Sequence, residues 1–222
     1  MRTAYRAALP ALGLVCALAA TPAQAHPHVW IKMQSDIVFN EQGLITGVNV
    51  SWTFDDAYAQ VALDGLDKNG DGVYDPSELE PLTHENLDSL KDYNYFTYVR
   101  YDGKPQAIGT PIDAGQIYSE NKLQLHFQVP LVTPIDPTKG EFVLKTYDPE
   151  FFIAFDYEKD EPVSVIGNMP KNCQVVVKPV PTDAQLDQTK AMLATKGTDW
   201  KPPEDEDFGS LFAQPVTIQC RA

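Results

Sequence analysis

One short segment constrains this chain more than any other, the stretch from Asp67 to Glu78, which reads DKNGDGVYDPSE. Side chains that carry oxygen occupy its first, third, fifth, ninth and twelfth positions, and glycine occupies the sixth. A calcium ion takes about six to eight oxygen ligands, so a chain that binds it must wrap around it, and the glycine permits the sharp turn. The pattern is that of an EF-hand calcium loop, and it predicts these ligands: Asp67, Asn69, Asp71, the carbonyl of Val73, Asp75 and Glu78.

The residues on either side of the loop predict helices. Asp75 can cap a helix, Pro76 suits its first position, and Glu78 completes a capping box. Apolar residues at helical spacing between Asp55 and Leu66 predict a short entering helix. We therefore expect a helix-loop-helix insertion at about residues 55–93. The alternative is an Asp/Gly-rich surface turn without an ion.

Tyr74 departs from the usual loop pattern, because the eighth position is typically aliphatic and pairs with a second loop. No second segment of the sequence has both the central glycine and the closing glutamate. The sequence thus predicts a single, unpaired EF-hand, which argues against a calmodulin-type switch.

The first 25 residues have the features of a secretory signal peptide. Arg2 and Arg6 precede an apolar run, and Ala23-Gln24-Ala25 is a typical cleavage site. The run is too short to anchor the protein in a bilayer. We expect a periplasmic protein with no membrane insertion after cleavage, consisting of one domain over residues 26–222.

Charge and cysteine content narrow the possible functions. The first 25 residues contain two arginines and no acidic residue, so the formal net charge of −14 becomes −16 after cleavage. Such a surface repels nucleic acids and attracts cations, although ordinary solubility also explains it. Two of the three cysteines remain, and in an oxidising compartment we expect Cys173 and Cys220 to form a disulfide.

The expected mature chain begins with His26-Pro27-His28, which offers a second kind of metal site. A terminal amine and the imidazoles of His26 and His28 can chelate zinc, nickel, cobalt or copper. Pro27 lacks the amide that the amino-terminal copper motif requires. The alternative is that both histidines only flank a processing site. His84 lies on a polar stretch and His126 on the polar face of a predicted strand, and the sequence leaves open whether either joins a metal site.

Most of the remaining sequence predicts β-strands. Segments rich in β-branched and aromatic residues, such as 29–40, 44–54 and 123–129, are separated by Gly, Pro and Asp turns. About nine such strands predict a mainly β, α+β fold, an antiparallel β-sandwich-like body that carries the EF-hand insertion and a carboxy-terminal helix from Ala184.

The order of these features resembles the DUF1007 family. The resemblance rests on HPHVW after the signal peptide, SWTFDD before the acidic loop, KTYDPEFFIAF, and the carboxy-terminal cysteine pair. It implies an exported bacterial protein that accompanies a membrane permease of the nickel/cobalt type or serves zinc acquisition. In that case His26 and His28 match the opening motif of the family, and the acidic loop matches its aspartate-rich segment.

These observations favour a non-enzymatic, periplasmic, calcium-binding and metal-handling accessory protein of a zinc or nickel/cobalt transport system. Its partners would be metal ions and a permease. One alternative is a calcium-stabilised extracytoplasmic interaction module. Another is a copper enzyme that uses the terminal histidine, although no serine, cysteine or paired-carboxylate catalytic motif is recognisable.

Overall fold

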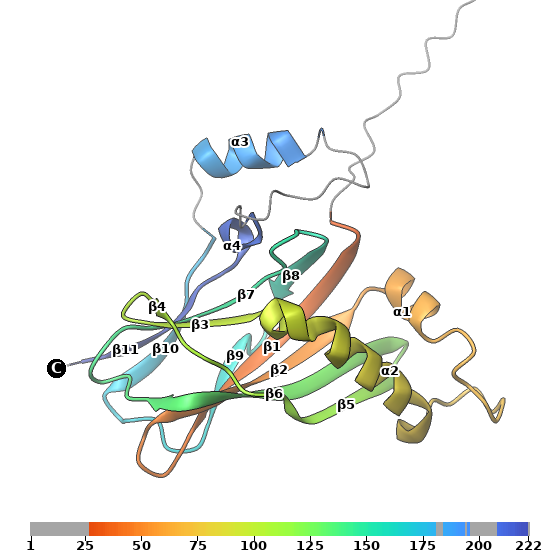
Figure 1. The fold of residues 1–222 in the computed structure, drawn as a ribbon, viewed down its shortest axis with the longest axis horizontal. Coiled ribbons are helices and arrows are strands. Elements are labelled where there is room, and N and C mark those ends of the chain that lie inside the picture. The colour runs from red at the N-terminus through yellow and green to blue at the C-terminus, as the bar shows by residue number, and fades with distance from the viewer. Residues whose placement is uncertain (1–26, 181–183, 194, 196–207, 222) are drawn as a thin grey trace, which may run out of the picture.

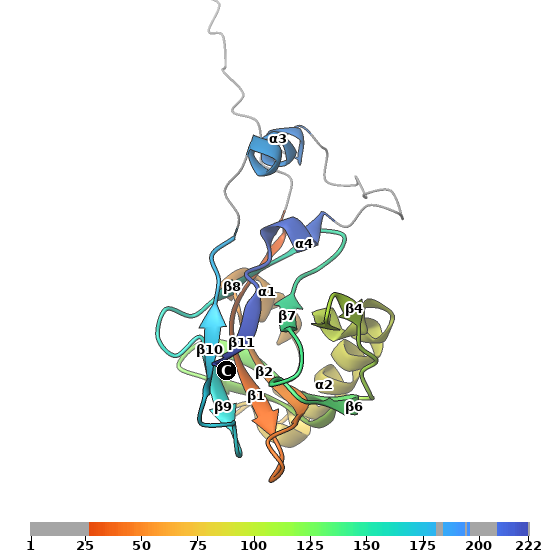
Figure 2. The same ribbon diagram turned by 90° about the vertical axis from the view of Figure 1, so that its left-hand side faces the viewer.

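The computed structural model describes residues 27–180, 184–193, 195 and 208–221, so the expected signal peptide and His26 lie outside the described residues. The body consists of two β-sheets (Figures 1 and 2). The first has the order β5-β6-β2-β1-β8, with β9 also paired to β1. Its strands are β1 (Val29–Phe39), β2 (Ile45–Phe54), β5 (Ile112–Ser119), β6 (Lys122–Ile135), β8 (Ile153–Tyr157) and β9 (Val163–Ile166).

The second sheet has the order β10-β11-β7-β3-β4. Its strands are β3 (Thr97–Tyr101), β4 (Lys104–Pro105), β7 (Phe142–Thr146), β10 (Cys173–Val177) and β11 (Val216–Cys220). The helical elements are α1 (Asp56–Ala62), α2 (Pro76–Leu90), the 3-10 segment η1 (Lys91–Phe96), α3 (Ala184–Leu193) and α4 (Gly209–Phe212). The predicted β-rich α+β class is confirmed.

The pairing within the first sheet differs in part from the predicted antiparallel arrangement. β8 and β9 both run parallel to β1, one beside each half of that strand. They occupy the edge of β1 that β2 leaves free, since β2 and β1 form the predicted antiparallel hairpin. Hairpin signals in the sequence report only neighbours along the chain, so they cannot reveal these parallel pairs.

The core lies between the two sheets and under α1 and α2. Strand β2 alternates, and its inward residues include Val48, Val50 and Trp52, each 2% exposed or less. The Trp52 ring meets Phe127 of β6 and Phe155 of β8 edge-on, with centroids 5.0 and 5.1 Å away. This cluster joins three strands of the first sheet.

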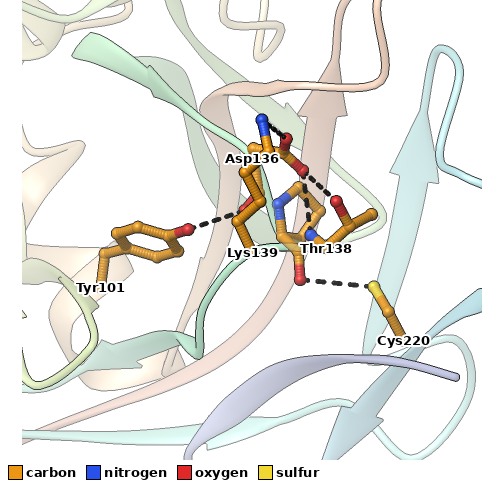
Figure 3. A network of polar contacts seen from close by, with 6 residues as sticks. Tyr101, Asp136, Thr138, Lys139 and Cys220 are labelled. Carbon is orange, nitrogen blue, oxygen red and sulfur yellow. Dashed lines mark hydrogen bonds and ion pairs between the residues drawn. The ribbon is translucent and has the colours of Figure 1, made fainter. Parts of the chain in front are cut away.

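The predicted disulfide is confirmed, and it staples the end of the chain to its neighbouring strand. Cys173 and Cys220 face each other in the β10–β11 ladder and are bonded. Beside them, the Asp136 carboxylate accepts hydrogen bonds from both the backbone and the hydroxyl of Thr138 and pairs with Lys139 at 2.9 Å (Figure 3). Tyr101 donates to the Asp136 carbonyl at 2.9 Å, so this turn is tied to β3 as well.

Candidate metal site

The predicted EF-hand loop connects α1 to α2 at one end of the first sheet (Figure 1). Asp55 caps α1, because its Oδ1 accepts a hydrogen bond from the Tyr58 N–H at 2.9 Å. Its other oxygen, Oδ2, accepts from the Trp30 N–H at 2.8 Å. One carboxylate therefore fixes the entering helix to strand β1.

The exiting helix begins as the sequence predicts. Asp75 is the N-cap of α2, Pro76 occupies its first turn, and the Glu78 Oε2 accepts from the Asp75 N–H at 3.1 Å. This reciprocal cap holds Glu78 at the helix start, where it is only 7% exposed. Glu78, the twelfth residue of the loop, therefore also belongs to the first turn of α2.

The first half of the loop is folded around the Asp67 carboxylate. Its two oxygens accept from the N–H groups of Gly70 at 2.7 Å and Gly72 at 3.0 Å. Both glycines have positive φ angles, 73° and 78°. A Cβ at either position would meet nothing within 4 Å, so backbone conformation and not space requires glycine here.

The last predicted ligand closes the loop onto its beginning. Glu78 Oε1 accepts from the Lys68 N–H at 2.9 Å, which brings the twelfth position next to the second. Between them, Asn69 accepts from the Asp71 N–H at 2.9 Å, and Asp71 accepts from the Val73 N–H at 2.8 Å. The loop is wrapped in the order that the sequence predicts.

The donor chemistry of this loop fits calcium, which prefers carboxylate, amide and carbonyl oxygens. In the described part of the chain, no group of three or more His, Cys, Asp or Glu side chains is arranged to hold a metal ion. In the loop, Asp67, Asp71 and Glu78 instead accept hydrogen bonds from loop N–H groups. Two further predicted ligands, the Asn69 amide oxygen and the Val73 carbonyl oxygen, are not His, Cys, Asp or Glu side chains, so they fall outside that statement. Calcium binding therefore stays a prediction.

The unusual tyrosine of the loop packs against the body of the protein. The Tyr74 and Tyr118 rings meet edge-on, with centroids 5.2 Å apart and planes at 78°. Tyr118 belongs to β5. A strand of the first sheet therefore contacts the loop position that contacts a second loop in paired EF-hands.

His28, from the amino-terminal histidine motif, lies against the second family motif, YDPEFFIAF. The His28 N–H donates to the Phe152 carbonyl at 2.8 Å, and the two rings have centroids 4.6 Å apart. Close by in the sequence, Glu150 accepts from the Tyr93 hydroxyl at 3.3 Å. Segments more than a hundred residues apart in the sequence are thus brought together at the edge of β1 and β8.

Asp148, which sequence reasoning did not single out, organises this second motif. Its Oδ1 accepts from the Glu150 N–H at 2.9 Å, and its Oδ2 accepts from the N–H groups of Phe152 at 2.9 Å and Ile153 at 3.0 Å. Burial raises the pKa of this carboxyl, while these backbone hydrogen bonds act in the opposite direction. The sequence feature that could have predicted this role is an Asp-Pro pair directly after a strand, because an aspartate before a turn often accepts hydrogen bonds from backbone N–H groups two residues on.

Gly209 is needed where the chain returns to this motif. A Cβ at that position would lie 1.9 Å from the Asp148 carbonyl oxygen, so only glycine allows this approach.

The other two histidines lie apart from these motifs. His84 is exposed on α2, with its Nε2 3.7 Å from Glu80. His126 lies on the outer face of the first sheet, opposite Gly115 of β5. In the residues that the structure describes, neither joins a metal-holding group of side chains. No helix in the described ranges is both long and apolar enough to cross a membrane.

Comparison with known proteins places these motifs in a family. Residues 11–220 match the model of DUF1007, described as a protein of unknown function. The chain is 26% identical to an uncharacterized protein of Haemophilus influenzae over 205 residues, which is 88% of this chain and 91% of that protein. It is 31% identical over 99 residues to an uncharacterized 15.5 kDa protein from the trpE 3' region of Spirochaeta aurantia, covering 45% of this chain and 70% of that protein. Because the family model spans nearly the whole sequence, this chain is a member of the DUF1007 family.

Proposed function

We propose that this protein is a non-enzymatic, calcium-binding accessory protein of a periplasmic transition-metal transport system. The observation that carries the calcium part is the closed loop, in which the Glu78 carboxylate accepts from the Lys68 N–H at 2.9 Å. A carboxylate at the twelfth position beside the loop start is what bidentate closure around calcium requires.

Calcium has a structural role in this proposal. The loop and its two flanking helices are attached to the first sheet at three places: Asp55 against β1, Tyr74 against β5, and Thr83 of α2, whose hydroxyl lies 3.4 Å from Gln116 Oε1. An ion that binds only the folded loop stabilises the whole domain, by about 1.4 kcal/mol when its concentration is tenfold above the dissociation constant. At extracellular calcium levels the loop would then be occupied continuously.

The transition-metal part of the proposal rests on the amino terminus. Imidazole nitrogens suit zinc, nickel, cobalt or copper, whereas the loop supplies only oxygens. His28 is held at a fixed place by Phe152, so it can act as one nitrogen ligand beside His26. The permease partner and the periplasmic location come from the family resemblance and from the expected signal peptide.

Titration of the mature protein with calcium, zinc, nickel and copper tests this division into two sites. We expect Glu78→Gln to weaken calcium binding alone and His26→Ala to weaken transition-metal binding alone. If either change weakens both, the two-site proposal is wrong.

A calcium-stabilised interaction module is the second candidate. The half-exposed rings of Trp30 and Phe152, 52% and 46% accessible, lie near the amino-terminal motif and favour it, because exposed aromatic residues often mark contact sites. It would be supported if calcium removal abolished partner binding while no transition metal bound the protein.

A further inference from the structure

Strand β5 is an open edge of the first sheet. It pairs only with β6, and within the described residues no backbone hydrogen bond satisfies its other side. Exposed edges usually carry lysine or proline, which block pairing with other chains, but the β5 sequence IDAGQIYS has neither. A register shift interrupts the strand between Ile112 and Gly115, and from Gly115 to Ser119 it is regular. Ile117 is 50% exposed in this regular part.

One hollow lies beside this edge strand, and a second, over β1, β2 and β6, reaches it at Asp113. One, of about 700 Å³, lies between α2 and β5, and the other, of about 440 Å³, lies on the outer face of the first sheet. His126 lines both hollows. Its ring lies over Gly115, where a Cβ would be 2.9 Å from Cε1. The absence of a side chain on Gly115 therefore leaves room for the imidazole that the two hollows share.

The charged side chains around these hollows are acidic. Glu80 lines the hollow beside α2, and Asp36, Asp113 and Glu161 line the outer one. Among the described lining residues there is no lysine or arginine. An occupant with basic side chains would therefore complement both hollows.

The buried side-chain amide of Gln116 is an independent observation that points to a bound partner. Its side chain lines the hollow beside α2, is only 4% exposed, and has an Nε2 without a hydrogen-bond partner in the described chain. Its Oε1 lies 3.4 Å from the Thr83 hydroxyl. A buried donor without an acceptor carries a free-energy cost. An acceptor on an occupant of this hollow would remove that cost.

We propose that β5 binds an extended, basic peptide segment of a partner protein, which adds to the first sheet as a further strand. The backbone of the peptide would pair with the free edge, and its alternate side chains would point to opposite faces of the sheet, one set toward the hollow beside α2. A second copy of this chain is a poorer occupant, since the formal net charge of the whole chain is −14 and two acidic residues, Asp113 and Glu80, lie beside the edge. This surface contains none of the predicted metal ligands, although the predicted calcium loop contacts the same strand through Tyr118.

Fluorescence anisotropy with defined peptides tests the proposal. The probes are two fluorescein-labelled nine-residue peptides, one alternating valine with lysine and the other alternating valine with glutamate. We expect the mature protein, at physiological salt with calcium present, to bind the lysine peptide at least about tenfold more tightly than the glutamate peptide. Absence of binding, or equal binding of both peptides, would overturn the proposal.

A matched pair of variants locates the binding. Ile117→Lys places a charge on the edge, and Val132→Lys adds the same charge at a 65% exposed position of β6, beyond its ladder with β5. We expect Ile117→Lys to weaken binding of the lysine peptide by about tenfold or more and Val132→Lys to leave it within about twofold of the unmodified protein. Equal effects of the two changes would contradict the assignment to β5. So would sedimentation that shows a dimer which Ile117→Lys dissociates, because self-pairing would then occupy the edge. Calcium titration of the same samples tests the calcium proposal independently of peptide binding.

Discussion

The ring of Tyr74, at the eighth position of the predicted EF-hand loop, meets the ring of Tyr118 edge-on, with centroids 5.2 Å apart. This contact joins the loop to an edge strand of the first sheet. The contact gives the predicted single loop a neighbour within the same chain.

The aromatic contact predicts a coupling between the loop and the sheet. Tyr118→Ala removes an interaction worth about 1 kcal/mol beyond burial, so we expect calcium affinity to fall about fivefold in calorimetric titration. Tyr98→Ala is the matched control, because Tyr98 stacks on Tyr147 in another part of the body, at 4.1 Å. It should lower stability without changing calcium affinity. Unchanged affinity in Tyr118→Ala would show that the loop closes without the sheet.

The packing of His28 on Phe152 predicts that Phe152 supports a transition-metal site. Phe152→Ala frees the His28 ring without removing a ligand, so we expect zinc or nickel affinity to fall severalfold and calcium affinity to stay the same. His84→Ala, on the exposed face of α2, is the control and should change neither. Equal zinc affinity in Phe152→Ala and the unmodified protein would mean that His28 is not a ligand held by that ring.

The Asp148 carboxylate predicts a large stability effect at a residue that touches no proposed ligand. Asp148→Ala leaves the N–H groups of Glu150, Phe152 and Ile153 without their acceptor, and we expect a loss of about 2–4 kcal/mol in urea unfolding. Asp148→Asn retains one accepting oxygen and should lose less. If alanine and asparagine are equally tolerated, these hydrogen bonds do not hold the motif.

The buried hydroxyl of Tyr157 predicts that the protein loses folding stability at alkaline pH. Burial raises its pKa to about 12, and the hydroxyls of Ser35 and Thr146 act in the opposite direction. Because the folded-state pKa lies above the usual value of 10.0, the unfolded chain releases this proton first as pH rises. The contribution to stability is therefore complete below about pH 10 and is lost between about pH 10 and 12.

Replacement by phenylalanine isolates that contribution. We expect the Tyr157→Phe variant to lose less stability between pH 9 and pH 11 than the unmodified protein, measured as the change in urea midpoint. Parallel losses in the two proteins would show that Tyr157 does not carry the effect.

Local sequence signals predicted several features because their causes are local. The capping box at Asp75, the loop glycines and the strands β2 and β6 each depend on nearby residues, and the structure has them as expected. The pairing of Cys173 with Cys220 followed from the number of cysteines left after cleavage.

Other features depend on contacts that the sequence does not encode locally. Strand β5 was not predicted, because Asp113, Ala114 and Gly115 have weak strand preference and the register with β6 supplies the pairing. The parallel pairing of β8 with β1 brings His28 next to Phe152. No periodic pattern in the sequence predicts this contact. The role of Asp148 was not predicted because it accepts hydrogen bonds from backbone N–H groups that come close to it only in the folded turn.

Calcium titration of the mature protein by calorimetry and thermal unfolding, beside the Glu78→Gln variant, tests the central claim most directly. Glu78→Gln keeps an acceptor for the Lys68 N–H but removes the charged, bidentate group. We expect the unmodified protein to bind one calcium ion and to gain about 1.4 kcal/mol or more of stability at millimolar calcium, and the variant to show neither response. Absence of any response to millimolar calcium in the unmodified protein would contradict the account.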